Sequence, residues 1–444
     1  MDFVSFKNAV FAAAEKKGLT EYEIYYQGCC STVATAYKQE INDFSSSTEG
    51  GLCFRCIYGG KMGYASTEAM TDAPGLVARA MDNASVLEAQ EQVFLAEGGQ
   101  AYHKWTGKNY KLPSTPQLLD LILAAQKALY AAGATDGTTV KGVSEENVIE
   151  IYNSKGLDVR TKVDICALIL SAVVAGDGEK VSEYKIHLGD PEKMDIAALA
   201  EDVVAKAKEK LGGKVPQTGQ CPVIFSPKAM AALLGVYSSI FFAGRAQKGL
   251  SKFAGCEGTT IAAACVTLVD DPFHPDCPIP MTFDGEGSPT KKKTVIEGGM
   301  LKTLLYNLKT ANVAGKKTTG NAAKGHYDAS VGTHAYSMYI CGGECTEEEL
   351  LKTAENGVYI TNLSGLHAGA NAVTGDFSLQ SAGFLIENGQ KTTAINGFTV
   401  AGNFYQLLKD IRAVANNSHL PEPIGMTAYG APSTLVDGLT IAGK

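Results

Sequence analysis

The histidines are the first side chains to consider for metal or acid–base chemistry, and the chain has seven: His103, His187, His274, His326, His334, His367 and His419. No two of them have the spacing of four or five residues, with glutamate after the first, that puts two imidazoles on one helix face beside a general base. His326 and His334 lie in the loop-like stretch GHYDASVGTH, where they could bind a metal together with Asp328. A structural or surface role for these residues is the alternative.

Carboxylates form a second candidate site. Asp270 and Asp271 stand before Pro272, and Asp284 and Glu286 lie in the stretch FDGEG. Carboxylates within about 6 Å of each other can shift each other's pKa or hold a hard cation. Aspartate and glycine also form turns readily, so a purely structural role for this group stays open.

Eleven cysteines cannot all form pairs, and their irregular spacing indicates reduced thiols of a cytoplasmic protein. Cys53 and Cys56 have the CxxC spacing of some zinc and redox sites. They lie in a strand-like stretch, where residues three apart point to opposite faces, so we expect one thiol to face the core and the other to face outward. Cys341 and Cys345 would need ligands from elsewhere in the chain to hold a metal.

The net charge of the chain indicates which classes of binding partner to expect. The formal net charge is −8, and the densest basic run is Lys291-Lys292-Lys293. Attachment to nucleic acid or to an anionic membrane needs a basic face, so we expect neither partner. The N-terminal stretch reads as an amphipathic helix rather than a signal peptide, and no window of about 18 residues is uninterruptedly apolar. We therefore expect a cytoplasmic protein.

The pattern of apolar residues predicts the elements that would position these side chains. Helical periodicity is found at residues 3–17, 73–90, 115–132, 197–211, 227–243 and 407–415. Strand-like segments include residues 22–26, 31–37, 42–46, 148–152, 158–171 and 183–187, with tight turns at Gly59-Gly60 and Gly176-Asp177-Gly178. After residue 255, short strands alternate with Gly, Asp and Asn turns.

These elements predict an α+β protein of two domains. We expect an N-terminal α/β domain at residues 1–215, with an antiparallel sheet and flanking helices. We expect a C-terminal domain at residues 216–444 that is mostly antiparallel β and barrel-like. A stretch rich in turn residues, at 212–220, links the two.

Residues 373–389, with the sequence VTGDFSLQSAGFLIENG, are the most informative stretch of the chain. Thr374-Gly375-Asp376 indicates a turn and residues 377–386 a strand. Asn388-Gly389 indicates a type I′ hairpin turn, because both of its central positions need a positive φ. Residues 397–401 supply the second strand. The hairpin holds neither a nucleophile with its base nor a set of metal ligands.

This stretch and several others resemble the TldD/PmbA family, the modulator of DNA gyrase proteins associated with zinc-dependent proteolysis. In the N-terminal half the resemblance rests on GLCFRCIYGGKMGYAST and the following DAPGLVARAMDNA. In the C-terminal half it rests on DDPFHPDCPIPMTFDGEGSPTKKKTVIEGGMLKTLLYNLKTA, NGVYITNLSGLHAGANAVTGDFSLQSAGFLIENG, TVAGNF and STLVDGLTIAGK. The similarity covers most of the chain.

TldD-like members of the family carry HExxxH on a helix and a downstream cysteine ligand, whereas PmbA members, also called TldE, lack this motif. At the similar helix of this chain Gly235 stands at the first histidine position, Val236 at the glutamate and Ile240 at the second histidine. Where the TldD branch has its cysteine, this chain has the VTGD turn. None of these three side chains can bind zinc or act as a base. The resemblance thus implies the PmbA branch, with no catalytic residue, metal ligand or cofactor in this chain.

The resemblance also implies partners. It implies a heterodimer with a TldD-like catalytic subunit, which encloses a cavity where an unfolded peptide lies extended beside a sheet. Zinc is then expected only in the TldD-like partner, and a homodimer is possible when the chain is alone. The turn residues Gly375, Asp376, Phe377 and Ser378 are our candidates for the peptide groove, and hairpin geometry explains them equally well.

Two other functions stay open. An independent hydrolase could use His326, Asp328 and His334, or Asp271, Asp284 and Glu286. An interaction protein that modulates DNA gyrase would act through protein contacts, because the acidic chain lacks a basic face for DNA.

Overall fold

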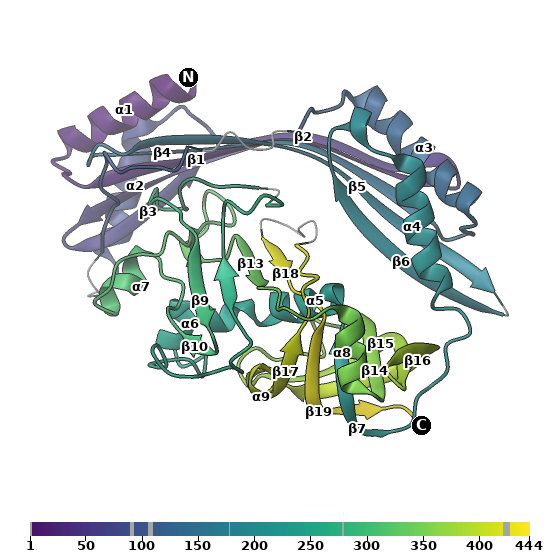
Figure 1. The fold of residues 1–444 in the computed structure, drawn as a ribbon. Helices are drawn as coiled ribbons and strands as arrows, with labels where there is room; N and C mark the ends of the chain where they lie inside the picture. Colours follow the sequence, from purple (N-terminus) through teal and green to yellow (C-terminus); the bar gives the residue numbers. More distant parts are fainter. Residues whose placement is uncertain (1, 89–92, 105–109, 177, 278, 421–426) are drawn as a thin grey trace.

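The computed structural model describes residues 2–88, 93–104, 110–176, 178–277, 279–420 and 427–444. A long curved sheet forms the N-terminal part and lies across a C-terminal part that contains the other sheets (Figure 1). No described helix is long and apolar enough to cross a membrane.

Six strands form the N-terminal sheet: β1 (Tyr22–Tyr37), β2 (Glu40–Tyr58), β3 (Lys61–Thr67), β4 (Thr139–Asn153), β5 (Asp158–Gly176) and β6 (Glu179–Leu188). They lie in the order β3-β2-β1-β4-β5-β6, and all neighbours are antiparallel. The register of β1 on β2 shifts once, between Thr35 and Ala36.

Four helices cover one face of this sheet: α1 (Phe3–Lys16), α2 (Ala73–Ser85), α3 (Thr115–Ala132) and α4 (Ile196–Lys208). α1 and α2 pack on Ile24 and Phe54, and α3 and α4 pack on Ala34 and Leu168. Side chains alternate along a strand, so Ile24 and Ala34 of β1 point to the same side. All four helices therefore lie on that side.

Short polar residues begin three of these helices. Asp2, Asp72 and Asp195 accept a hydrogen bond from the backbone N–H three residues further on, at 2.9–3.0 Å. These caps satisfy amide groups that have no partner inside the helix. α3 begins with a capping box of Ser114 and Gln117 and ends at Gly133, whose φ is 109°.

Five strands close a barrel in the C-terminal part: β7 (Gly219–Phe225), β14 (Gly357–Ser364), β15 (Asp376–Glu387), β16 (Gln390–Asn403) and β19 (Thr434–Ala442). Their order is β16-β15-β14-β7-β19, and β16 also pairs with β19, which closes the ring. β17 (Ile411–Val414) pairs with β19 outside the ring. Among the described strands of this sheet, only β7 and β14 pair in parallel.

A second sheet has the order β10-β9-β8-β13-β18, with bounds β8 (Leu268–Asp270), β9 (Lys293–Glu297), β10 (Met300–Leu301), β13 (Ser337–Ile340) and β18 (Ala428–Gly430). β11 (Ala322–Ala323) and β12 (Gly332–Thr333) form a separate two-stranded antiparallel sheet, and in the sequence they lie between β10 and β13. The helices of this part are α5 (Pro227–Tyr237), η2 (Ser238–Phe241), α6 (Ala243–Gln247), α7 (Leu308–Val313), α8 (Glu347–Ala354) and α9 (Phe404–Asp410), and η1 (Pro191–Lys193) precedes α4.

The face of the N-terminal sheet opposite its helices packs on the C-terminal part. Tyr25 and Ile151 of the sheet form one buried cluster with Phe283 and Tyr327. Contacts through large buried side chains fix the two parts of the chain against each other.

The α+β class, the antiparallel sheets and the barrel-like C-terminal region are confirmed. All strands of the N-terminal sheet precede residue 189 and β7 begins at Gly219, but the division at residues 215 and 216 stays a prediction. The expected turn at Gly176-Asp177-Gly178 includes position 177, which lies outside the described residues. The helix expected at 73–90 is too long, because α2 ends at Ser85, and positions 89 and 90 lie outside the described residues.

Several predicted elements differ in extent. The segments 22–26 and 31–37 are one strand, β1, because Gly28 continues the ladder to β2 and β4. The helix expected at 227–243 ends at Tyr237 and continues as a 3₁₀ turn. The helix expected at 407–415 spans Phe404–Asp410 and then becomes β17, because residues 411–414 pair with β19.

The expectation for Cys53 and Cys56 is wrong in one respect. The two thiols do lie on opposite faces of β2, but both are buried, with exposed fractions of 2% and 0%. Cys56 lies under the helices, and the face that carries Cys53 is covered by the C-terminal part. The sequence of one strand cannot show that both of its faces are covered.

The turn between β15 and β16 gives a test of the fold. Asn388 and Gly389 have φ values of 51° and 74°, as a type I′ turn requires. Gly389→Val should lower the free energy of unfolding by about 1–3 kcal/mol, because a branched residue is strained there and its Cβ would lie 3.0 Å from Lys352 Cα. Urea unfolding measures this. Gln390→Val, at the exposed next residue, is the control, and equal midpoints for both variants would contradict the assignment.

Candidate functional site

α5 and η2 carry the positions where metal ligands would be expected by resemblance. α5 begins after Ser226, whose hydroxyl accepts from the N–H of Ala229 at 3.2 Å. Gly235 and Val236 lie in its last turn, and Ile240 lies in η2. The helix is thus formed and held in place, although its side chains have no ligand atoms.

An aromatic ring closes the space beside Gly235. A Cβ atom at this position would lie 3.1 Å from Cδ2 of Tyr429 in β18, which is closer than ordinary van der Waals contact. The Tyr429 hydroxyl forms a hydrogen bond of 3.0 Å with the hydroxyl of Ser238. Sequence reasoning missed Tyr429, which lies far along the chain from α5.

The residues around this helix do not fit a zinc ion. Ile240 is completely buried in the hydrophobic core, and Val236 is half-buried against the same core. Zinc needs nitrogen, sulfur or carboxylate ligands, and neither side chain offers one. Within the described ranges, no three His, Cys, Asp or Glu side chains lie close enough to hold a metal ion.

The predicted groove residues span the end of the VTGD turn, at Gly375, and the first three residues of β15, Asp376 to Ser378. Gly375 has a φ of 90°, and a Cβ there would lie 2.4 Å from Tyr405 Cδ2, so only glycine fits. The Asn403 amide donates to Asp376 Oδ1 at 2.7 Å and to the carbonyl of Thr374 at 3.0 Å. These bonds tie the start of β15 to the end of β16.

The four candidates divide between the core and the surface. Gly375 and Phe377 are buried, whereas Asp376 and Ser378 are exposed. Asn403, and then Thr374, hold the pKa of Asp376 below its usual value through side-chain hydrogen bonds. An ionised Asp376 and the polar Ser378 can therefore contact a ligand, whereas the other two residues shape the turn.

Tyr237 connects this turn to α5. Its hydroxyl donates to the backbone carbonyl of Asp376 at 2.7 Å, and its ring stacks on Phe404 at a centroid distance of 4.4 Å. The structure thus places the end of α5, whose residues lack ligand atoms, next to the VTGD turn at residues 373–376. The spacing of tyrosines in the sequence does not indicate this contact.

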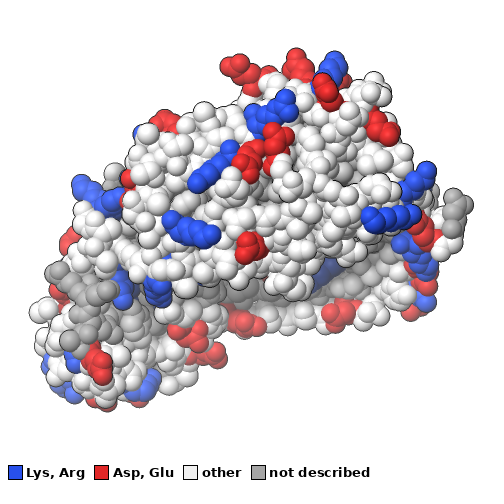
Figure 2. Space-filling view, turned by 90° about the horizontal axis from the view of Figure 1, so that it is seen from below, with Lys and Arg blue, Asp and Glu red and all other residues white. Residues whose placement is uncertain are grey.

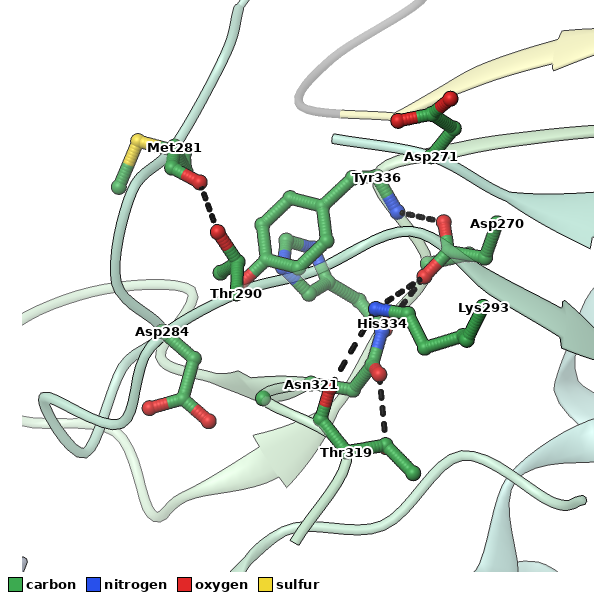
Figure 3. A network of polar contacts seen from close by, with 12 residues as sticks. Asp270, Asp271, Met281, Asp284, Thr290, Lys293, Thr319, Asn321, His334 and Tyr336 are labelled. Carbon is green, nitrogen blue, oxygen red and sulfur yellow. Dashed lines mark hydrogen bonds and ion pairs between the residues drawn. The ribbon is translucent and has the colours of Figure 1, made fainter. Parts of the chain in front are cut away.

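The acidic stretches do not form one site. Asp270 ion-pairs with Lys293 at 3.0 Å and accepts from Asn321 and from the backbone N–H of Tyr336, both at 2.8 Å (Figure 3). Its oxygens are thus satisfied inside the protein, as a structural role requires. Asp271 instead pairs with Lys292 at 3.4 Å.

Asp284 and Glu286 lie where the two parts of the chain meet. Arg55 of β2 contacts Glu23 of β1 at 2.6 Å and Glu286 at 3.8 Å, and all three side chains are buried. Glu286 also accepts from the N–H of Leu308 at 2.9 Å. Buried charges that are paired in this way fix a geometry, because an unpaired member would cost several kcal/mol.

The metal site considered for His326, Asp328 and His334 does not form among the described residues. His326 is exposed, and its Nδ1 lies 2.5 Å from Asp328 Oδ1. Burial lowers the pKa of His334 to about 4, and its ring packs on Tyr336. A neutral, partly buried imidazole and a surface pair do not form a common metal or catalytic site.

The packing of Tyr429 on Gly235 gives a double-mutant test. Gly235→His should destabilise the protein by about 1–3 kcal/mol, because the new side chain meets the ring. The cost should be smaller in a Tyr429→Ala background, where the obstruction is absent. Urea unfolding of the four proteins in this cycle measures the coupling. Strictly additive effects would show that the ring does not fill this space.

Asp284 gives a test by pH. Burial, and then the neighbouring Glu286 carboxylate, raise the pKa of Asp284 to about 7. In the unfolded chain Asp284 ionises near pH 4, so its stabilising effect is full below about pH 4 and is lost as the pH rises through about 7. Relative to wild type, Asp284→Asn should therefore gain in free energy of unfolding as the pH rises from about 4 to about 7. The control is Asp437→Asn, at an exposed carboxylate. If the free energy of unfolding of Asp284→Asn changed with pH in parallel with that of wild type, the raised pKa of Asp284 would be contradicted.

Comparison with known proteins identifies the family. Residues 22–84 match PmbA/TldA metallopeptidase domain 1, residues 109–211 match the central domain and residues 218–443 match the C-terminal domain. The metalloprotease PmbA of Escherichia coli O157:H7 is 27% identical over 300 residues, which are 66% of this chain and 63% of that protein. A metalloprotease of Methanothermobacter thermautotrophicus is 24% identical over 414 residues, which are 90% of this chain and 89% of that protein.

Solved structures of similar proteins agree with the family match. A Thermotoga maritima protein described as a candidate modulator of a DNA gyrase is 28% identical with a TM-score of 0.88, over 99% of this chain and 100% of that one. TldE from Thermococcus kodakarensis shares the fold at 24% identity with a TM-score of 0.86, over 98% of this chain and 99% of that one. This chain belongs to the PmbA/TldD metallopeptidase family.

Proposed function

We propose that this chain is the non-catalytic, PmbA/TldE-type subunit of a cytoplasmic zinc metallopeptidase that acts on unfolded peptides. The single observation that carries the proposal is the chemistry at α5, where Gly235, Val236 and Ile240 offer no ligand atom and Tyr429 fills the space beside the helix. Zinc would then belong to a TldD-like partner, and this chain would have no cofactor of its own.

A heterodimer would complete the peptidase. The partner would supply the metal and the base, and this chain would supply one wall of the cavity. Asp376 and Ser378 are exposed at the start of β15, so the segment Gly375, Asp376, Phe377 and Ser378 is our candidate for the part of that wall that meets the peptide. A chain without its partner could form a homodimer through the same surface.

The surface charge supports a polypeptide partner rather than a nucleic acid or a membrane. On the face drawn in Figure 2, acidic and basic side chains of the described residues are interspersed, and no continuous basic surface is visible there. Nucleic-acid binding depends on clustered lysine and arginine. All eleven cysteines are described and are free thiols, which supports a cytoplasmic location.

Zinc content and peptidase activity test this proposal together. The purified chain should contain far less than one zinc per protomer and should not cleave an unfolded peptide, because it lacks ligands and a base. Elemental analysis by mass spectrometry measures the zinc, and a fluorogenic peptide of disordered sequence measures cleavage. Addition of a TldD-like subunit of the same family should produce activity.

The control is the same TldD-like subunit with the two histidines of its motif replaced by alanine, which should give no activity in the mixture. One zinc per protomer together with cleavage by the isolated chain would overturn the proposal.

A further inference from the structure

Part of β2 has no neighbour on its outer side. β3 pairs only with Leu52–Tyr58 of β2. Residues 40–51 of the same strand pair with β1 on the inner side, and no described strand lies on the other. Residues 42–49 are all exposed. The outer backbone N–H and C=O groups of this segment, which we term the β2 edge (residues 40–51), are open to a further strand.

The β2 edge has few of the devices that normally prevent strand addition. Such edges are usually protected by charged side chains, above all lysine, by proline, by a bulge or by a covering element. The charged residues of this edge, Glu40, Asp43 and Glu49, are all acidic, so they repel acidic segments and can pair with basic ones. The edge contains no Lys, Arg or Pro, and its pairing with β1 is regular from Asp43 to Gly51. The single register shift lies at the far end, beside Ile41. The edge is therefore long, straight and competent for pairing.

A side chain of the C-terminal part packs at the end of the β2 edge. The ring of Tyr327 lies so close to Gly51 that a Cβ there would be 2.3 Å from Tyr327 Cζ. The Tyr327 hydroxyl donates to Glu68 Oε1 at 2.7 Å, directly after the end of β3. Tyr327 thus links the end of β3 to the end of the β2 edge, at the point where β3 stops pairing with β2.

The two faces of the β2 edge differ in chemistry. Phe44 is opposite Ala34 and lies on the helix side, with 46% of its surface exposed. Asp43 and Glu49 lie on the other side, about 20 Å apart along the strand. In the described part of the chain neither carboxylate has an ion-pair partner.

A second copy of this edge is a poor partner. Residues 40–51 contain no basic side chain, so self-pairing supplies no cation to either carboxylate. The antiparallel register centred on Ser46 would place Asp43 opposite Glu49, and like charges in that position are destabilising. Charge complementarity instead requires an added segment whose basic residues lie opposite Asp43 and Glu49.

We propose that the β2 edge binds an extended segment of another protein, which adds as an antiparallel strand. The segment carries Lys or Arg opposite Asp43 and Glu49, six positions apart on one face, and an apolar residue opposite Phe44 on the other. The site lies on a different sheet from the segment at residues 375–378, and the proposal does not depend on whether this chain is catalytic.

Two designed peptides test the charge requirement on the full chain. The first has twelve residues of alternating threonine and valine, with lysines at two positions six apart, and the second has glutamates at those positions. Fluorescence anisotropy at low salt should show that the lysine peptide binds about tenfold more tightly, because two favourable pairs replace two repulsive ones. Asp43→Lys with Glu49→Lys should reverse this preference.

The double variant Glu201→Lys with Asp437→Lys is the matched control, since both carboxylates are exposed on other elements and the charge change is the same. It should keep the preference for the lysine peptide. No binding at millimolar concentration, equal binding of the two peptides, or a preference that survives the exchange at Asp43 and Glu49 would overturn the proposal.

Strand addition also predicts which backbone atoms matter. Only alternate N–H groups of an added strand point toward its neighbour. Lysine peptides that are N-methylated on the odd or on the even residues should therefore differ, with one set losing binding and the other retaining it. Full binding by both methylated peptides would show that the contact is electrostatic only and would contradict strand addition.

Discussion

The packing around α5 is the constraint on which the account of this chain depends. Tyr429 closes the space beside Gly235, Ile240 is enclosed in the core, and Tyr237 joins the helix to the turn before β15. A catalytic metal helix must instead leave an open position for water and substrate. Here the same helix is used as a structural element.

This packing explains how, under the proposed function, a member of a metallopeptidase family would keep the fold without metal ligands at α5. The hydrogen bonds of Asn403 and Tyr237 hold the VTGD turn at one end of the barrel. Asp376 and Ser378 face outward from it. In the proposed function, these polar groups contact a peptide that the partner subunit cuts, because α5 and this turn offer no zinc ligand set.

A buried ionic contact fixes the second relationship in the molecule, between the N-terminal sheet and the C-terminal part. Arg55 reaches Glu23 in the neighbouring strand and Glu286 across the interface. Charges of this kind are costly to bury, so they tolerate little change in geometry. Together with Tyr327 they hold the sheet in a fixed position and leave the β2 edge open beyond Gly51.

Local sequence signals predicted the local structure. Asn388-Gly389 indicated the hairpin because few other residues accept its backbone angles, and α1 and α3 were found close to their true bounds. The short helices α7 and α8 were missed although both begin with a capping box. The change from α9 to β17 was missed because pairing with β19 is a tertiary contact. The burial of Cys53 was missed for the same reason, since a distant segment covers it.

The site was predicted less completely than the fold. The absence of ligand atoms at Gly235, Val236 and Ile240 is visible in the sequence, but the residue that fills the space, Tyr429, comes from a distant strand. The carboxylates near residues 270–286 looked like one group, yet Asp270 and Glu286 pair with different basic residues. Proximity in sequence does not determine which side chains meet.

The most direct measurement is an anomalous difference map recorded at the zinc absorption edge, from crystals of this chain grown with added zinc. The account predicts no peak near α5 or the turn at residues 374–376. A strong peak with ligand distances of about 2.0–2.3 Å at this helix would contradict it.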